Sequence, residues 1–185
     1  TWRVGNRHVY AIPVARPLKT READLLVDPY VLGAWLGDGK TADARFYTDD
    51  IEVLEELGRC GQLSVPHADP FAYGLPGLIA RLKTLGVIGN KHIPGVYLRA
   101  SIAQRWALLA GLMDTDGHVE SGNSRCEFSS TVRALADGFV ELATSLGLKP
   151  LVREVQPSVQ YRGRRVNGSP AWRVRFVAYD DAPVF

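Results

Sequence analysis

The fold is decided by the stretch Leu109-Ala-Gly-Leu-Met-Asp-Thr-Asp-Gly117, an apolar run that ends in an acid followed by glycine. A second run ends the same way 78 positions earlier, as Val31-Leu-Gly-Ala-Trp-Leu-Gly-Asp-Gly39. Each run is followed by a short aromatic, strand-like segment and then by an amphipathic helix with a polar start. A repeat of this kind predicts two similar halves joined in one chain.

The remaining helices and strands are predicted from the spacing of apolar residues. A spacing near 3.6 predicts helices over 49–58, 75–85 and 131–147, and the helix that carries the second motif is expected to begin near Ser101. Strands are expected at 44–47, 96–99, 126–129 and 151–155, with a hairpin that pairs 158–162 with 172–177 around Asn167-Gly168. The fold class is α+β, and the order helix, hairpin, helix, hairpin, helix occurs twice with approximate twofold symmetry.

Small residues inside the two motifs predict that the motif helices touch. Gly33 and Gly37 lie one turn apart, and each glycine inside a helix costs about 0.5–1 kcal/mol relative to alanine. Close approach of two backbones explains that cost, and Gly111 and Thr115 take the matching places in the second motif. We therefore expect the two helices to pack through these small faces.

The same packing brings two carboxylates together. Asp38 and Asp116 end the two motifs, each followed by a glycine that lets the chain turn out of the helix. Negative charge is unfavourable at a helix C-terminus, and two neighbouring carboxylates repel each other. A hard divalent cation with oxygen ligands relieves both costs, so the pair predicts a metal site.

The second motif resembles the nine-residue signature LAGLIDADG, with Met113 and Thr115 as its departures. The first motif is a looser copy, in which Leu36 stands where the second motif has Asp114. We interpret Asp114 as a helix-end cap or a residue of the packing interface. On these motifs the chain is similar to LAGLIDADG homing endonucleases over nearly its whole length.

This resemblance implies a fold of two pseudo-symmetric αββαββα halves with saddle-shaped antiparallel sheets. It also implies site-specific hydrolysis of both strands of double-stranded DNA, with Mg²⁺ held by Asp38 and Asp116 beside Gly37 and Thr115. Such ions stabilise the attacking hydroxide and the leaving oxygen of an in-line displacement. Because one chain carries both motifs, the resemblance implies a monomer.

Members of the family also place a basic residue near each site. Lys91, in the segment Lys91-His-Ile-Pro94, is assigned to activating or orienting water in the first half, with an exposed lysine in a turn as the alternative. The second half has no clear lysine counterpart, so repeat spacing suggests Arg173, with Lys149 as a fallback. This departure puts balanced cutting of the two strands in question.

The distribution of charge says more about DNA than the net charge does. The whole chain has 22 basic and 20 acidic residues, a formal charge of only +2. Between positions 153 and 175, however, the sequence contains six arginines and a single acid, Glu154. Arginine binds phosphate oxygens and guanine edges, although a solvated basic hairpin is the alternative. The expected DNA contacts are Arg162, Arg164, Arg165, Arg173 and Arg175.

The first part of the chain points to an intein. Val9-Tyr-Ala-Ile-Pro13 resembles the strand that closes the first splicing block of inteins. We expect residues 1–28 to continue from a splicing domain in cis or a linker, 29–100 to form the first half and 101–185 the second. The chain lacks an initial Cys or Ser and a terminal His-Asn, so it is not expected to splice by itself. A replicative DNA helicase is the suspected host.

Composition excludes several other classes. No apolar run is long enough to span a membrane, no signal peptide is recognisable, and Cys60 and Cys126 lack zinc-finger spacing. A cytoplasmic protein with reduced thiols is expected. Two functional alternatives stay open: a cleavage-inactive DNA-binding module or maturase-like remnant, and a purely structural insertion without affinity for DNA.

Overall fold

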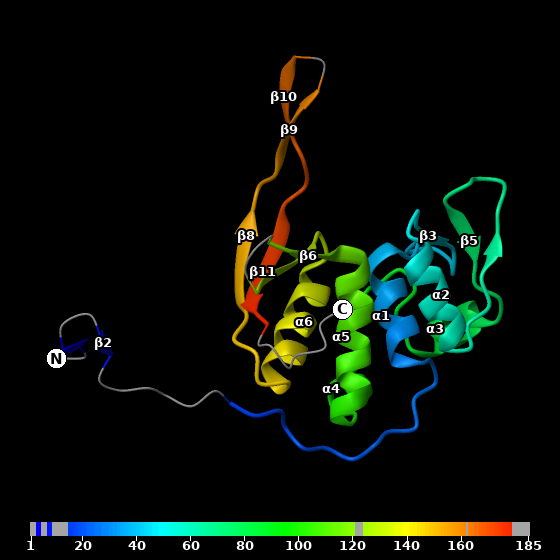
Figure 1. Cartoon of the computed structure of the whole chain (residues 1–185). Helices are drawn as coiled ribbons and strands as arrows, with labels where there is room; N and C mark the ends of the chain where they lie inside the picture. Colours follow the sequence, from blue (N-terminus) through cyan, green and yellow to red (C-terminus); the bar gives the residue numbers. More distant parts are fainter. Residues whose placement is uncertain (1–2, 5–6, 9–14, 121–123, 162, 179–185) are drawn as a thin grey trace.

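A computed structural model describes residues 3–4, 7–8, 15–120, 124–161 and 163–178. Two motif helices, α1 (Pro29–Asp38) and α5 (Ile102–Asp116), lie side by side at the centre of the molecule, with one half of the fold on either side of them (Figure 1). The class is α+β with antiparallel sheets, as predicted. No helix within the described ranges is long and apolar enough to cross a membrane.

The first half surrounds α1 with short elements. Its antiparallel sheet has the strand order β3-β5-β4, and an isolated bridge between Gly39 and Phe46 takes the place of the first predicted hairpin. Its elements are β3 (Phe46–Tyr47), α2 (Ile51–Arg59), β4 (Val65–Pro66), β5 (Ala72–Gly74), α3 (Leu78–Thr84) and α4 (Gly95–Leu98).

The second half has a larger antiparallel sheet with the strand order β6-β7-β11-β8. Its elements are β6 (Gly117–Val119), β7 (Arg125–Ser130), α6 (Arg133–Ser145), β8 (Leu151–Val155) and β11 (Ala171–Val177). Helix α6 covers one face of this sheet, where Phe139 stacks on Phe128 at 4.2 Å between ring centroids and contacts Phe176. The final helix expected in this half falls beyond residue 178, outside the described residues.

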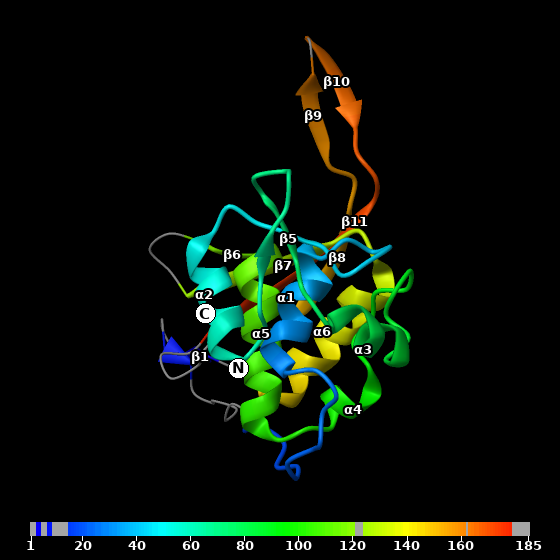
Figure 2. The same ribbon diagram turned by 90° about the vertical axis from the view of Figure 1, so that its right-hand side faces the viewer.

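Two further strands form an arm that leaves the body of the protein. Among the described strands, β9 (Ser158–Tyr161) and β10 (Arg164–Asn167) pair with each other alone, and they project well beyond the four-stranded sheet (Figures 1 and 2). We call residues 158–167 the arm. Near the other end of the chain, β1 (Arg3–Val4) pairs with β2 (Arg7–His8), whereas the splicing-block segment 9–13 lies outside the described residues.

Local sequence explains where the central helices begin. The Asp28 side chain accepts hydrogen bonds from the backbone N–H groups of Tyr30 and Val31, and Pro29 occupies the first helical position of α1. Ser101 and Gln104 form a reciprocal capping box at the start of α5, which confirms the predicted beginning of that helix.

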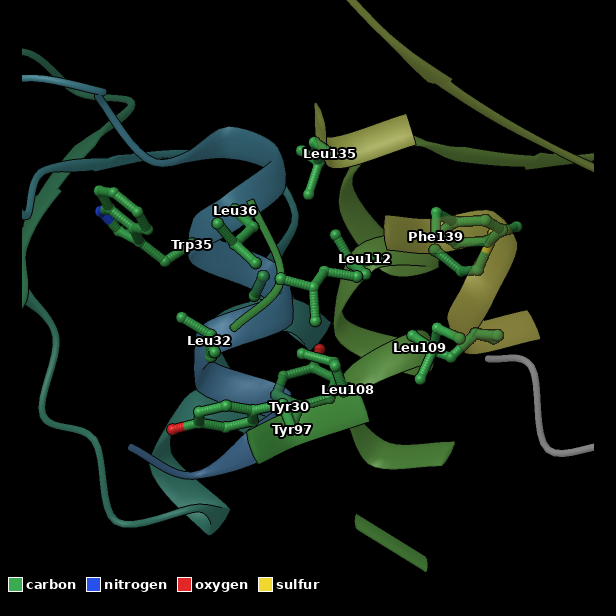
Figure 3. Close-up of a cluster of buried hydrophobic side chains, with 14 of the residues drawn as sticks. Tyr30, Leu32, Trp35, Leu36, Tyr97, Leu108, Leu109, Leu112, Leu135 and Phe139 are labelled. Carbon is green, nitrogen blue, oxygen red and sulfur yellow. The ribbon is translucent and has the colours of Figure 1, made fainter. Parts of the chain in front are cut away.

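Glycine lets α1 and α5 approach to backbone contact, as predicted. A methyl group placed on Gly33 would lie 2.3 Å from the carbonyl oxygen of Leu108, and one on Gly111 would lie 2.3 Å from that of Tyr30. Around this contact, Leu32, Leu36, Leu108 and Leu112 form the buried core between the helices (Figure 3). The packing of the two helices leaves no room for a side chain at either glycine.

The predicted strand at 96–99 is wrong, because these residues lie in and directly after the short helix α4. Pro94 precedes it with extended dihedral angles, and its carbonyl accepts from the backbone N–H of Tyr97. The Tyr97 hydroxyl is then held by the backbone N–H and carbonyl of Val27. Tyr97 and Leu98 are neighbours in sequence and both are buried, so the segment lacks the alternating burial that a strand would show.

The predicted hairpin is also wrong in its pairing. Residues 158–161 pair with 164–167, whereas Ala171–Val177 pairs with both β7 and β8 in the main sheet. The turn therefore lies at 162–163, where Gly163 adopts a φ of 74° that favours glycine. Gly168 instead closes the base of the arm by donating to the carbonyl of Pro157.

An N-terminal strap, residues 15–28, runs without helix or strand along the end of the molecule where α5 begins (Figure 1). The fully buried Arg105 on α5 holds it, because its guanidinium donates to the Leu18 carbonyl and to the Thr20 hydroxyl. The same guanidinium donates to the Ser145 carbonyl on α6 at 2.9 Å and the Ala100 carbonyl at 2.9 Å. One side chain thus joins three segments that are distant in sequence.

Candidate active site

Asp38 and Asp116 meet where α1 and α5 end, because the small faces of both helices are in contact there. A methyl group placed on Gly37 would lie 2.0 Å from the Thr115 hydroxyl oxygen and 3.6 Å from a carboxylate oxygen of Asp116. Both helices stop at extended glycines, Gly39 and Gly117, which matches the predicted turn out of each helix. The predicted juxtaposition of the two motif ends is confirmed.

The two carboxylates are held at an electrostatic cost. Burial and the neighbouring Asp38 raise the pKa of Asp116 to about 6, although Lys91 acts in the opposite direction. Burial likewise raises the pKa of Asp38, and Lys91 again lowers it. The folded protein therefore favours added positive charge at this place.

Lys91 provides one positive charge from the first half. Its side chain is not in an exposed turn, since the residue is only 8% exposed. Its Nζ donates to the Gly37 carbonyl at 2.7 Å and lies 5.4 Å from the centre of the Trp35 ring. Burial lowers the pKa of Lys91, while Asp116 and Asp38 raise it. The ammonium group therefore lies at the end of α1 and interacts electrostatically with both acids.

A hollow of about 260 Å³ opens beside Asp116 between the two halves. Lys91 and Thr41 line it from the first half, and Ser129 and Thr131 line it from the second. Its lining is rich in hydroxyl and charged groups, which suits a polar ligand such as a phosphodiester. The Thr115 hydroxyl is engaged within its own helix, where it donates to the carbonyls of Gly111 and Leu112.

A larger hollow of about 710 Å³ lies along α1, α2 and α5. Its acids include Asp50, Glu52, Glu56 and Asp114, so it repels a polyanion. Asp114 accepts a hydrogen bond from the Tyr30 hydroxyl at 2.8 Å across the interface of the two central helices. Its predicted role at the packing interface is confirmed.

The predicted basic residue of the second site, Arg173, lies on β11 with its guanidinium turned to a carboxylate. Its Nε is 3.4 Å from Oε1 of Glu127, a residue that the sequence did not single out. Arg175 donates from its Nε to the other oxygen of Glu127 at 2.5 Å. The fallback, Lys149, lines a different hollow with Leu151. The catalytic assignment of Arg173 therefore stays a prediction.

The arginines expected to contact DNA are split between two places. Arg173 and Arg175 lie on the main sheet, whereas Arg164 and Arg165 lie in the arm and Arg162 falls outside the described residues. Arg165 is exposed and donates from Nε to the Ser158 hydroxyl across the arm at 2.8 Å. Glu127 was missed because only the register of β7 with β11 places it between arginines.

Comparison with known sequences finds a shared domain in proteins of different kinds. A family model described as a LAGLIDADG-like domain matches residues 103–177. The replicative DNA helicase DnaB of Mycobacterium intracellulare is 40% identical over 168 residues, which is 90% of this chain and 26% of the helicase. An iron–sulfur cluster assembly SufBD family protein of Mycobacterium leprae is 28% identical over 168 residues, 79% of this chain and 19% of that protein. The chain thus spans about a quarter or less of the relatives it matches.

Comparison with solved structures finds the same fold in the homing endonuclease I-DmoI. Its structure in complex with DNA and Ca has a TM-score of 0.52 at 11% identity and covers 82% of each chain. A structure of mesophilic I-DmoI variants has a TM-score of 0.51 at 11% identity, with 82% of this chain and 88% of the other covered. The likeness extends over both halves of the fold.

Proposed function

This chain belongs to the LAGLIDADG family, and from that premise we propose that it is a site-specific homing endonuclease that hydrolyses both strands of double-stranded DNA. The observation that carries the proposal is the pair Asp38 and Asp116 at the paired helix ends, where burial raises both carboxyl pKa values. A scaffold that only binds DNA gains nothing from this costly arrangement.

Mg²⁺ is the proposed cofactor, and the donor set fits it. Within the described ranges, no three His, Cys, Asp or Glu side chains gather to hold a metal by themselves. Mg²⁺ commonly binds through one or two carboxylates and takes water and phosphate as its other ligands. Asp38 and Asp116 would hold the ion, with Gly37 and Thr115 beside it. When bound, it supplies stabilisation of the charge that develops on the phosphate and the leaving oxygen.

Lys91 is proposed to orient the attacking water and to screen the phosphate, since its Nζ already lies at the end of α1. Burial lowers the pKa of Lys91, while Asp116 and Asp38 raise it, so both acids act electrostatically on this ammonium group. Arg173 is the proposed counterpart in the second half. Because its guanidinium is paired with Glu127, we expect the two strands to be cut at unequal rates.

The proposed DNA surface belongs mainly to the second half. Arg173 and Arg175 lie on its sheet and Arg164 and Arg165 in its arm, and Arg162 comes two positions before Arg164 in the sequence. I-DmoI, which shares the fold, was solved in complex with DNA and Ca. Ser129 pairs with Arg173 across β7 and β11 and lines the hollow that contains Asp116, so this sheet borders the acids.

We also propose that this chain is the endonuclease of an intein. A helicase and an iron–sulfur assembly protein, whose chemistry is unrelated, both contain a stretch like it within much longer chains. An inserted element explains that distribution. Residues 1–28 would continue from the splicing domain in cis, 29–100 and 101–185 would form the two halves, and a cytoplasmic monomer would suffice because both motifs share one chain.

The test is cleavage of a duplex that carries the uninterrupted helicase-gene insertion site, in the presence of Mg²⁺. The native chain is expected to cut both strands, and Asp38→Asn and Asp116→Asn are each expected to lower the rate by about 10³-fold or more, because each removes charge stabilisation at the phosphate. Asp137→Asn, which alters an exposed carboxylate paired with Arg133 on α6, is the matched control and should cut normally.

Binding measured on the same duplex separates the alternatives. Specific binding without any cut by the native chain would identify a cleavage-inactive module. Neither binding nor cutting would leave a structural insertion.

A further inference from the structure

Glu127 organises the basic surface of the main sheet. It stands on β7 directly opposite Arg175 and two pairs away from Arg173. Each of its carboxylate oxygens meets the Nε of a different arginine, at 3.4 Å for Arg173 and 2.5 Å for Arg175. The Glu127 side chain is 19% exposed, whereas the arginine side chains are 41% and 57% exposed. The carboxylate is the inner member of the cluster.

This contact decides which edge of each guanidinium is free. A guanidinium has five N–H donors in a rigid plane. When Nε is turned to a carboxylate, the two terminal nitrogens at the far end keep parallel N–H groups available. Two parallel donors match O6 and N7 of guanine in the major groove. Arg173 and Arg175 are thus held in the geometry that reads guanine.

The Glu127 carboxylate also disfavours binding of a DNA phosphate by these two arginines. The negative charge of Glu127 offsets part of the positive charge of Arg173 and Arg175, so the pair attracts a phosphate less than it would without the carboxylate. A phosphate that approached both arginines would also meet Glu127, and that repulsion selects against backbone contacts. A neutral base edge meets no such penalty.

The spacing along β11 sets the spacing of the bases. Residues two apart on a strand share a face and lie about 6.8 Å apart. Stacked base pairs rise about 3.4 Å each, so Arg173 and Arg175 address positions two steps apart when β11 follows the groove. Both lie on the face opposite to Val174 and Phe176, which are buried under α6.

We propose that Glu127 is a specificity-determining residue, which holds Arg173 and Arg175 to read two guanines separated by one base pair in the half-site bound by the second half. This inference rests on the proposed function, since it requires that the main sheet binds duplex DNA, and Arg173 then reads a base instead of serving as the basic residue of the second active site. It adds a sequence feature, guanine-any base-guanine, to a target that is otherwise undefined.

The test is selection of bound sequences from a random-sequence duplex library by the full chain, with Ca²⁺ in place of Mg²⁺. The native chain is expected to enrich two guanines one base pair apart, with about tenfold or greater preference at each. Glu127→Gln should bind the unselected library as tightly or more tightly and lose most of this preference. Arg175→Lys keeps the charge but not the planar fork, so it should lose one guanine of the pair.

Glu141→Gln is the control, because Glu141 on α6 is also an acid paired with an arginine, Arg99 at 2.6 Å, but it is not on a strand of the main sheet. It should select the same sequences as the native chain. Thermal unfolding of every variant checks that the fold is kept. Native enrichment without the spaced guanines, or a preference that survives in Glu127→Gln, would overturn the inference while leaving the endonuclease proposal intact. A native chain that retains no duplex at all would overturn both.

Discussion

Folding favours the neutral form of Asp116, because burial and Asp38 raise its pKa from 3.8 to about 6. The folded state thus binds a proton more tightly than the unfolded state does. The resulting contribution to stability is fully present below about pH 4 and is lost as the pH rises through 6. At neutral pH the ionised pair opposes folding, and a bound cation would remove that opposition.

Asp116→Asn should therefore stabilise the metal-free protein while it abolishes cutting. We expect the free energy of unfolding at neutral pH to rise by up to about 3 kcal/mol, because the amide is never ionised. The difference from the native chain should shrink as the pH falls from 7 to 4. Denaturant unfolding in EDTA measures both effects, with Asp137→Asn as the exposed control. An equally stable variant at pH 7 would contradict the assigned electrostatic cost.

At the scale of single residues, the sequence predicted those site residues that belong to a local motif. Asp38 and Asp116 were found because each ends a recognisable run beside a glycine. The burial of Lys91 beside them was not visible, because α1 and the loop that carries Lys91 are joined only by tertiary packing. Glu127 could not be identified for the same reason, because a single sequence does not show which residues of two strands are paired.

Among the elements, the contact of α1 with α5 depends on glycine, and this dependence is testable. Gly111→Ala would push a methyl group against the Tyr30 carbonyl at 2.3 Å and the Ala34 nitrogen at 2.8 Å, both of them backbone atoms. We expect a loss of about 3 kcal/mol or more of stability. Cleavage should fall as well, because the helix ends that carry the acids move apart.

Gly58→Ala is the control for that substitution. Gly58 also lies in a helix, α2, but a methyl group there would meet nothing within 4 Å. It should leave the protein as stable or add about 0.5–1 kcal/mol. Chemical denaturation of both variants gives the comparison, and equal effects would argue against backbone contact at Gly111.

The elements that sequence predicted best are those with strong periodicity and clear caps. Helix α6 and strand β8 lie close to their expected bounds. The arm was mispaired because two glycines, Gly163 and Gly168, offer alternative turns that differ only in tertiary surroundings. Helix α4 was mistaken for a strand because four residues are too few to show a period.

For the whole molecule, Arg105 connects the N-terminal strap to both α5 and α6 through hydrogen bonds. Arg105→Met should cost about 2–4 kcal/mol, since it leaves the Leu18 carbonyl and the Ser145 hydroxyl without a donor and removes one of two donors from the Ser145 and Ala100 carbonyls. Faster hydrogen exchange and proteolysis should be confined first to residues 15–28. Arg99→Met, which removes only an exposed ion pair with Glu141, should cost less than about 1 kcal/mol.

The inequality of the two sheets bears on the symmetry of the target. A dimer of identical subunits presents the same surface twice and therefore matches palindromes. Here one polypeptide contains both a three-stranded sheet of short strands and a four-stranded sheet that carries an arm. Each surface is free to change without altering the other. The DNA sequence that matches these two surfaces is consequently expected to be non-palindromic. Inverted repeats are scarce in ordinary coding DNA, so a non-palindromic target allows this protein to recognise sites within genes.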